Sequence, residues 1–361
     1  MSSKQVDICV VGAGPGGALL SLLLARQHMS VLLLESHSDI AKAFRGEHLN
    51  EEGEAILRAH NLFEAVEEQG LLRMETLEYW HNGEIFKTIL PDPTVGHLGI
   101  HVPQINLLTA ILNEAQKYPN FTLMTSTKVK QLKQDDNGRY CGVKAINQGQ
   151  ELDITSLFVI GADGRFSTIR KEAQLDREVH NHGFDLLWAK IPAPKNWSPS
   201  IKMALVGGSQ VSLFTQAKGF VQIGWNIEKG SYPTLRKQPF EPFIDLLAQA
   251  FPTLADSAKA SITSWKDFVV LDVFSSSSKN WSKDGVILIG DAVHTMTPTG
   301  AFGLNSSMKD AEILAQLITS EKVSQLELMT CATERKKAVA KLQAIQIEKE
   351  QSFADQFVVL A

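Results

Sequence analysis

The sequence predicts an α/β protein in which a Rossmann-like domain is interrupted by an inserted antiparallel sheet, and three observations support this. A glycine-rich turn joins an apolar strand to an apolar helix within residues 7–26. Two later apolar runs, at 157–160 and 286–289, have the composition of buried parallel strands that return to the same sheet. Between them, residues 176–272 consist of strand-like pieces joined by Gly, Pro and Asn turns, as in antiparallel sheets.

The N-terminal turn has the spacing of a dinucleotide-binding loop. Gly12, Gly14 and Gly17 fit the pattern G-x-G-x-x-G between a predicted strand and a predicted helix. The first glycine permits the turn, the second lets a pyrophosphate approach the backbone, and the third lets helix and strand pack closely. The helix N-terminus directs free N–H groups and the positive end of its dipole toward the phosphates. The other residues of the turn are expected to line the same site: Ala13, Pro15 and Gly16.

The next apolar run, at 31–34, ends in Glu35, where a dinucleotide site carries its ribose-binding acid. A carboxylate at this point disfavours a 2′-phosphate, because the two anions would repel each other. Two simpler interpretations stay open: a tight turn without a ligand, and an acid that is merely solvated. The order of strand, turn, helix, strand and acid predicts a site for an adenine dinucleotide.

Length and composition narrow the class of protein. With 361 residues, of which 44% are hydrophobic, the chain can bury a full core and form two or more domains. A net charge of −5 without a long basic run gives no support for a nucleic-acid partner. Cys9, Cys141 and Cys331 are scattered, which favours a reducing compartment over a disulfide framework.

No apolar stretch is long enough to cross a bilayer, and the first strand begins too early to leave room for a signal peptide. We therefore expect a cytoplasmic protein without a membrane partner.

The remaining elements follow from periodicity and turn residues. Asn82-Gly83 is a hairpin dipeptide between two strand-like runs. We expect helices at 51–60, 62–68, 107–117, 240–251, 304–318 and 325–350. We expect strands at 71–79, 84–90, 121–124, 128–134, 140–146, 184–191, 202–206, 210–216, 220–227 and 262–270.

Three signatures stand in a fixed order: the glycine turn with Glu35, Gly-Ala-Asp-Gly at 161–164, and Gly-Asp-Ala-Val-His at 290–294. This order resembles the FAD-dependent group A flavoprotein monooxygenases, the para-hydroxybenzoate hydroxylase-like family, over nearly the whole chain. The third signature is the most specific, and it continues through Pro298, Gly300, Gly303, Asn305 and Asp310-Ala311. Ala301-Phe302 departs from the family pattern, which suggests a stiffer loop at this point.

The resemblance implies a Rossmann-like FAD-binding domain with an inserted antiparallel-sheet substrate domain. Its FAD-binding parts are expected at 1–72, 101–175 and 273–322. The substrate domain is expected at 73–100 and 176–272, followed by a C-terminal helical segment at 323–361.

The resemblance also implies contacts with the cofactor. Asp291 would accept a hydrogen bond from a ribityl or ribose hydroxyl, and Gly300 and Gly303 would let the backbone approach the isoalloxazine. The N-terminus of the helix that begins near Leu304 would stabilise negative charge on the reduced flavin. The remaining cofactor-binding positions expected from the family are Val129, Gly290, Pro298 and Asn305.

Three further positions resemble family residues and also have simpler alternatives. Arg45 would reach the flavin phosphates, or is a surface arginine. Gln104 would contact the ribityl chain, or only begins a helix. Asp163 would support the flavin and a transient nicotinamide cofactor, or only caps the following helix.

By the same resemblance, NAD(P)H reduces bound FAD, O2 adds to give a C4a-hydroperoxide, and its distal oxygen passes to an aromatic or polycyclic small molecule. The flavin carries this chemistry, so no catalytic side chain and no metal site is expected. The pocket candidates are Trp188, Phe214, Trp225 and Pro298, although the three aromatic residues could equally form core. Several alternatives stay open. A separate partner could reduce the flavin, and the protein could be a monomer or a homodimer. The chain could also be a reductase, dehydrogenase or halogenase of the same fold. A flavin-binding regulator without enzyme activity is a further alternative.

Overall fold

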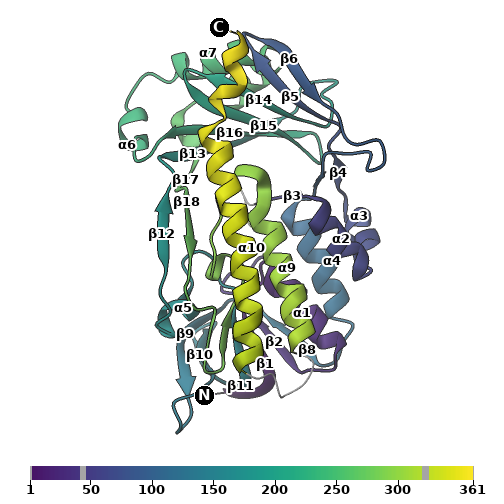
Figure 1. The fold of residues 1–361 in the computed structure, drawn as a ribbon, viewed down its shortest axis with the longest axis vertical. Coiled ribbons are helices and arrows are strands. Elements are labelled where there is room, and N and C mark those ends of the chain that lie inside the picture. The colour runs from purple at the N-terminus through teal and green to yellow at the C-terminus, as the bar shows by residue number, and fades with distance from the viewer. Residues whose placement is uncertain (1, 41–45, 319–324, 361) are drawn as a thin grey trace.

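A computed structural model describes residues 2–40, 46–318 and 325–360 (Figure 1). Its first sheet has eight strands in the order β19-β20-β11-β1-β2-β8, with β10 and β9 continuing from β11. The strands from β20 to β8 run parallel. The bounds are β1 Ser2–Val11, β2 Val31–Leu34, β8 Phe121–Met124, β9 Thr127–Gln134, β10 Tyr140–Asn147, β11 Gln150–Gly161, β19 Ser282–Lys283 and β20 Val286–Leu288.

Helices pack on this sheet because their apolar residues are buried on it. α1 is the most buried of them, since every residue from Gly16 to Ala25 lies in the interior. α1 packs against both α4 and α9. The helical bounds in this part are α1 Pro15–Arg26, α2 Glu51–Ala59, α3 Phe63–Gln69, α4 Gln104–Ala115, α5 Thr168–Glu172 and α9 Phe302–Leu317.

The second large sheet has seven strands in the order β17-β13-β16-β15-β14-β5-β6. α7 and α8 cover one face of it, where alternate strand residues form a separate apolar core. The bounds are β5 Thr76–His81, β6 Glu84–Ile89, β13 Phe184–Pro192, β14 Ser200–Val206, β15 Ser209–Gln216, β16 Phe220–Glu228, β17 Val269–Leu271, α6 Tyr232–Leu235, α7 Glu241–Ala250, η1 Pro252–Leu254 and α8 Ala255–Ser261. The α/β fold class with an inserted antiparallel sheet is thus confirmed, although β5 and β14 pair in parallel, whereas the exact domain limits stay a prediction.

One expected strand is wrong in its first half. Residues 262–270 contain the 3-10 helix η2, Trp265–Asp267, and only the short strand β17 follows it. Ser264 and Asp267 form a capping box there, with reciprocal side-chain to backbone hydrogen bonds that fix a helical turn.

Smaller elements connect the two sheets. β12, Glu178–Asn181, pairs with β18, Phe274–Ser277, and a three-stranded sheet joins β3, His48–Leu49, to β7, Ile100–His101, and β4, Leu72–Arg73. Two 3-10 turns, η3 Gly290–Ala292 and η4 Thr299–Ala301, precede α9.

The last helix, α10, Gln325–Gln351, runs along the first sheet and reaches the second one, as Figure 1 shows. η5, Ala354–Leu360, then places Phe357 against the rings of Tyr79 and Phe86 on the second sheet. η5 therefore packs on the second sheet at Phe357. Within the described ranges, the structure contains no helix with the length and hydrophobicity that crossing a membrane requires.

Candidate functional site

The glycine turn between β1 and α1 is built for close backbone packing with one opening. A Cβ atom on Gly12, whose φ is +107°, would lie 2.4 Å from the carbonyl oxygen of Ala162. A Cβ on Gly17 would lie 2.0 Å from the carbonyl oxygen of Gly12. A Cβ on Gly14 would meet no atom within 4 Å. The first and third glycines therefore serve packing, while the open space over the second fits a pyrophosphate.

The other turn residues connect this loop to its neighbours. Pro15 is the first residue of α1, where its fixed φ suits a helix start. A Cβ on Gly16 would lie 2.2 Å from Ser307 Oγ, so this glycine allows α1 to approach α9. The N–H of Ala13 donates to Glu35 Oε2 at 3.1 Å.

Glu35 lies at the end of β2, beside the glycine turn. The residue is 3% exposed, and its Oε1 accepts from the N–H of His37 at 3.0 Å and from Ser36 Oγ at 3.2 Å, and lies 2.7 Å from His37 Nδ1. Together with the N–H of Ala13, these contacts use the roughly four acceptor positions of the carboxylate, so a ribose hydroxyl would have to replace one of them. Val129, on β9, has its side chain in the apolar core on this side of the sheet. The ribose role of Glu35 and any cofactor contact of Val129 stay predictions.

Asp163 caps α5, which is the simpler of its two predicted roles. Its Oδ1 accepts from Ser167 Oγ at 2.5 Å, and its Oδ2 accepts from the N–H groups of Thr168 and Ile169 at 2.7 and 3.1 Å. Burial raises the pKa of this carboxyl, and the hydrogen bonds oppose that shift only in part. The structure neither requires nor tests an additional contact with a cofactor.

A buried arginine, which the sequence analysis missed, links the second signature to the third. Arg170 of α5 is 3% exposed and donates through Nη1 to the carbonyl of Ala292 at 2.6 Å. This bond fixes the η3 turn that carries Gly290 and the half-buried Asp291. Arg170 lies on the short helix that directly follows the loop of Asp163, and this proximity in the sequence is the signal that could have identified the arginine.

His294, which ends the third signature, belongs to a buried ion-pair cluster. Its Nε2 lies 2.6 Å from Asp310 Oδ2, which also accepts the N–H of Gly290 at 2.9 Å. Arg335 of α10 donates through Nε to Asp310 Oδ1 at 2.8 Å. Burial alone would raise the pKa of Asp310, but the charges and hydrogen bonds of these partners outweigh it and lower that pKa. The cluster fixes η3 between α9 and α10.

Two glycines shape the loop before α9. Gly300 has a φ of +73°, and a Cβ on it would lie 2.8 Å from Cε2 of Phe302. A Cβ on Gly303 would make only ordinary contacts, at 3.8 and 4.0 Å, with Met296 and Asp291. The N-terminal turn of this 16-residue helix carries the backbone N–H groups that the family resemblance expects to approach a flavin, and that contact stays a prediction. Pro298 and Leu304, predicted to line the site, lie partly buried on either side.

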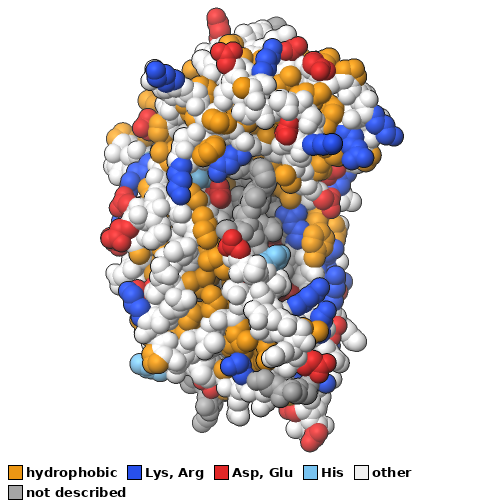
Figure 2. All heavy atoms as spheres, turned by 180° about the vertical axis from the view of Figure 1, so that it is seen from behind, with side chains coloured by type: hydrophobic (Ala, Val, Ile, Leu, Met, Phe, Trp, Pro, Cys, Tyr) orange, Lys and Arg blue, Asp and Glu red, His pale blue; other side chains and the backbone are white. Residues whose placement is uncertain are grey.

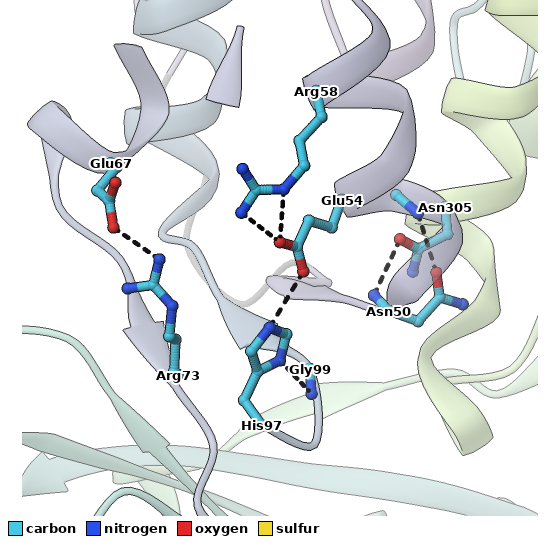
Figure 3. Close-up of polar contacts among 9 residues, drawn as sticks. Asn50, Glu54, Arg58, Glu67, Arg73, His97, Gly99 and Asn305 are labelled. Carbon is cyan, nitrogen blue, oxygen red and sulfur yellow. Dashed lines mark hydrogen bonds and ion pairs between the residues drawn. The ribbon is translucent and has the colours of Figure 1, made fainter. Parts of the chain in front are cut away.

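Asn305 ties the start of α9 to the start of α2, as Figure 3 shows. Its Oδ1 accepts from the N–H of Asn50 at 3.2 Å, and its Nδ2 donates to the carbonyls of His48 and Ala301 at 3.1 and 2.8 Å. A Cβ on Gly53 would lie 2.0 Å from Asn305 Oδ1, so only glycine allows this approach. The predicted cofactor residue therefore has a structural role that occupies both ends of its amide.

Beside it, Glu54 connects α2 to the loop before β7 (Figure 3). Arg58 donates to Glu54 Oε1 through Nε and Nη2 at 2.9 and 2.7 Å, and His97 Nε2 lies 3.2 Å from Glu54 Oε2. His97 Nδ1 accepts from the N–H of Gly99 at 3.1 Å, so Nε2 carries the proton that is donated to the carboxylate.

Glu47 joins α4 and β7 to the second sheet, and no sequence pattern predicts this role. Its Oε1 accepts from the N–H of Gln104 at 3.1 Å, at the first turn of α4. Its Oε2 lies 3.1 Å from His101 Nε2 and 3.3 Å from Gln216 Nε2 on β15. Gln104 is thus held beside β3, while its predicted ribityl contact stays a prediction. Arg45 lies outside the described residues.

Trp225 does not line a pocket, which corrects the sequence-based expectation. It is 3% exposed and stacks on Phe243 of α7 at 3.8 Å between ring centroids, in the core between sheet and helices. Trp188 pairs with Gly224 of β16, and Phe214 pairs with Gln222 of the same strand. Gly224 and Gln222 lie on the face opposite to that of Trp225, so Trp188 and Phe214 lie on that other face as well. Both side chains are only partly buried.

That second face is the one directed at the FAD-binding part. Phe214 and Gln216 are two residues apart on β15, so they lie on the same face of the sheet. Gln216 on this face contacts Glu47, which precedes β3. On the side of the molecule opposite to Figure 1, the surface is hollowed between its two parts, with Lys and Arg side chains around the rim (Figure 2).

Comparison with known proteins agrees with this geometry. Residues 5–344 match the model of the FAD binding domain family. The chain is 31% identical over 352 residues to 6-methylpretetramide 4-monooxygenase of Streptomyces rimosus, covering 95% of this chain and 83% of that protein.

Solved structures share the fold. PqsL of P. aeruginosa in complex with 2-aminobenzoylacetate superposes with a TM-score of 0.83 at 19% identity, covering 97% of this chain and 96% of that one. A ternary complex of aklavinone-11 hydroxylase with FAD and aklavinone gives a TM-score of 0.79 at 20% identity, covering 96% of this chain and 69% of that one. At this identity, the likeness concerns the fold. Together with the family match, these findings show that the chain belongs to the FAD-binding domain family, as a FAD-dependent monooxygenase.

Proposed function

We propose that the chain hydroxylates an aromatic or polycyclic small molecule, with NAD(P)H as reductant and O2 as the source of the oxygen atom. The observation that carries the proposal is the face of the second sheet that bears Trp188 and Phe214. It presents partly buried aromatic side chains on the face away from α7 and α8, as the wall of a pocket for a planar apolar substrate would. The named substrate of the Streptomyces rimosus relative is consistent with this class.

Within this proposal, the chain's residues bind and orient. The open space at Gly14 would receive the pyrophosphate of FAD, Glu35 the ribose, and the N-terminal turn of α9 the ring. FAD, when bound, supplies the two-electron chemistry and the activation of O2. The aromatic face of the second sheet would then hold the substrate and exclude water from the reacting carbon.

The test uses the purified full chain. We expect a flavin absorption spectrum, and oxidation of NADH or NADPH that increases when a phenol or a polycyclic ketone is added, with consumption of O2 and a hydroxylated product. Reduction of a substrate double bond without consumption of O2 would instead indicate a reductase. Substrate halogenation that depends on added chloride would indicate a halogenase. A chain that binds FAD but turns over with none of these compounds would count against the proposal.

A further inference from the structure

The loop that leads into α9 is held by side-chain amides at every second carbonyl. We call residues 295–301 the flavin loop. Gln343 Nε2 donates to the carbonyl of Thr295 at 3.0 Å. Gln346 Nε2 donates to the carbonyls of Thr297 and Thr299 at 2.8 and 2.6 Å. The carbonyl of Ala301 accepts from Asn305 Nδ2 at 2.8 Å.

Gln346 is the centre of this arrangement. Gln346 is 0% exposed, and its amide Nε2 donates both of its hydrogen bonds to carbonyls of the flavin loop. Gln343, Gln346 and Glu350 are three and four residues apart, so they lie along one face of α10. That face meets the loop, because Glu350 Oε1 accepts from Thr297 Oγ1 at 2.7 Å. A buried carbonyl that loses its donor costs free energy, so removal of the Gln346 amide would leave the buried carbonyl of Thr297 and the partly buried carbonyl of Thr299 without this donor.

The other carboxylate oxygen of Glu350 extends the contact to the strands between the two sheets. Glu350 Oε2 lies 2.5 Å from His182 Nδ1, and His182 Nε2 lies 2.8 Å from Ser275 Oγ on β18. Gln343 Nε2 also donates to the carbonyl of Ser276 at 3.1 Å. α10 therefore connects the flavin loop and β18 through one row of polar side chains.

The loop needs such support because its backbone is strained. Gly300 and Ala301 are consecutive left-handed residues, with φ of +73° and +55°. Glycine adopts this conformation freely, but alanine does so at a cost in free energy. Strained residues of this kind persist where surrounding contacts over-determine the backbone. Contacts from α10 and from Asn305 provide that constraint on both sides of the turn.

We propose that Gln346 is a positioning residue for the flavin: by holding the carbonyls of Thr297 and Thr299 on the α10 side, it fixes the flavin loop in the shape that binds the ring. The proposal rests on the proposed function only in that the ring lies against this loop. Gln343 and Asn305 act with it at the two ends of the loop.

The first test measures the affinity of the apo-protein for FAD by fluorescence titration, using Gln346→Leu and the matched control Gln351→Leu. Gln351 lies on the same helix and is exposed. We expect Gln346→Leu to weaken FAD binding by about tenfold or more, since two carbonyl acceptors lose their donor, and Gln351→Leu to leave it unchanged. Equal affinity in both variants would overturn the proposal. If the unmutated chain itself fails to bind FAD, the cofactor assignment fails instead.

A second variant separates hydrogen bonding from packing. In Gln346→Glu, a protonated carboxyl can donate to one loop carbonyl, whereas the carboxylate repels both. Burial raises the pKa of such a group. FAD affinity should therefore fall as the pH rises, by more than in Gln351→Glu and in the unmutated chain, in which Glu350 and His182 also face this region. A pH profile parallel to these controls would show that only volume matters at this position.

A third variant tests the strain. Ala301→Gly removes the cost of the left-handed alanine, so it should restore part of the FAD affinity lost in Gln346→Leu. No restoration would contradict the role of Gln346 in holding the strained loop.

Discussion

Arg335 of α10 donates to Asp310 Oδ1 at 2.8 Å, while His294 and the N–H of Gly290 share the other oxygen of the same carboxylate. Asp310 is 3% exposed, so its charge is solvated almost wholly by these partners. The last helix is thereby attached to the turn of the third signature.

Asp310→Asn should lower the free energy of unfolding by about 3–5 kcal/mol, because it leaves the charges of buried partners uncompensated. Urea denaturation of the apo-protein measures this. Asp256→Asn, at an exposed position, should change the free energy by less than about 0.5 kcal/mol. Equal effects of the two substitutions would contradict the role of the cluster.

The same carboxylate predicts a component of acid denaturation. Its pKa is lowered in the folded protein, so its stabilising contribution is present above the ordinary Asp pKa of about 3.9 and is lost as the pH falls below that value. Denaturation midpoints between pH 5 and pH 2 should therefore fall less steeply in Asp310→Asn than in the unmutated chain. A steeper fall in the variant would contradict this assignment.

His48 predicts a loss of stability at milder acidity. Burial first, and then the nearby charges of His101 and His97, lower the pKa of His48 to about 4. A folded pKa below the unfolded value of about 6.5 means that the unfolded chain binds the proton first, so stability falls as the pH drops from about 6.5 to 4. This loss should reach roughly 2–3 kcal/mol in the unmutated chain and be smaller in His48→Gln. His180→Gln, at an exposed histidine, should retain it. Denaturant unfolding at pH 7 and pH 5 distinguishes the two variants.

The glycine turn predicts opposite effects for two similar substitutions. Gly17→Ala should destabilise the fold by about 1–3 kcal/mol, because its Cβ would meet the carbonyl of Gly12. Gly14→Ala should leave the apo-protein stable, since its φ is −71° and its Cβ meets open space, but should weaken FAD binding. Thermal denaturation and FAD titration check both effects. Full FAD affinity in Gly14→Ala would argue against a pyrophosphate at this opening.

The two faces of the second sheet predict separable kinetic effects. Phe214→Ala should raise the KM for an aromatic substrate by about tenfold, while Trp225→Ala should lower the free energy of unfolding by about 3–5 kcal/mol with an unchanged KM. Steady-state kinetics on folded protein, together with urea denaturation, check this. A raised KM in Trp225→Ala would place that side chain in the pocket after all.

Turns and strands that depend mainly on neighbouring residues could be predicted from the sequence. The spacing of Gly12, Gly14 and Gly17 determines a turn, and apolar runs such as 157–160 determine buried strands, so the first sheet and its glycine turn were predictable. Trp225 was not, because alternation along one strand does not say which face a helix covers. That depends on how the chain after β16 folds back and packs α7 on the sheet, which the strand's own pattern does not encode.

Gln346 shows the same limit. A glutamine in a charged C-terminal helix has the pattern of a solvent-facing residue. The structure buries Gln346, because the carbonyls of Thr297 and Thr299 need donors that the loop itself does not supply. A requirement set by a distant loop leaves no local signal in the helix.

Incorporation of ¹⁸O tests most sharply whether the oxygen atom of the product comes from O2. The FAD-loaded chain is incubated with NAD(P)H, an aromatic substrate that stimulates its oxidation, and ¹⁸O2, and the product is analysed by mass spectrometry. If the protein is a monooxygenase of this kind, each product molecule should contain one ¹⁸O atom. A product formed without label from ¹⁸O2 would rule out this oxygen transfer.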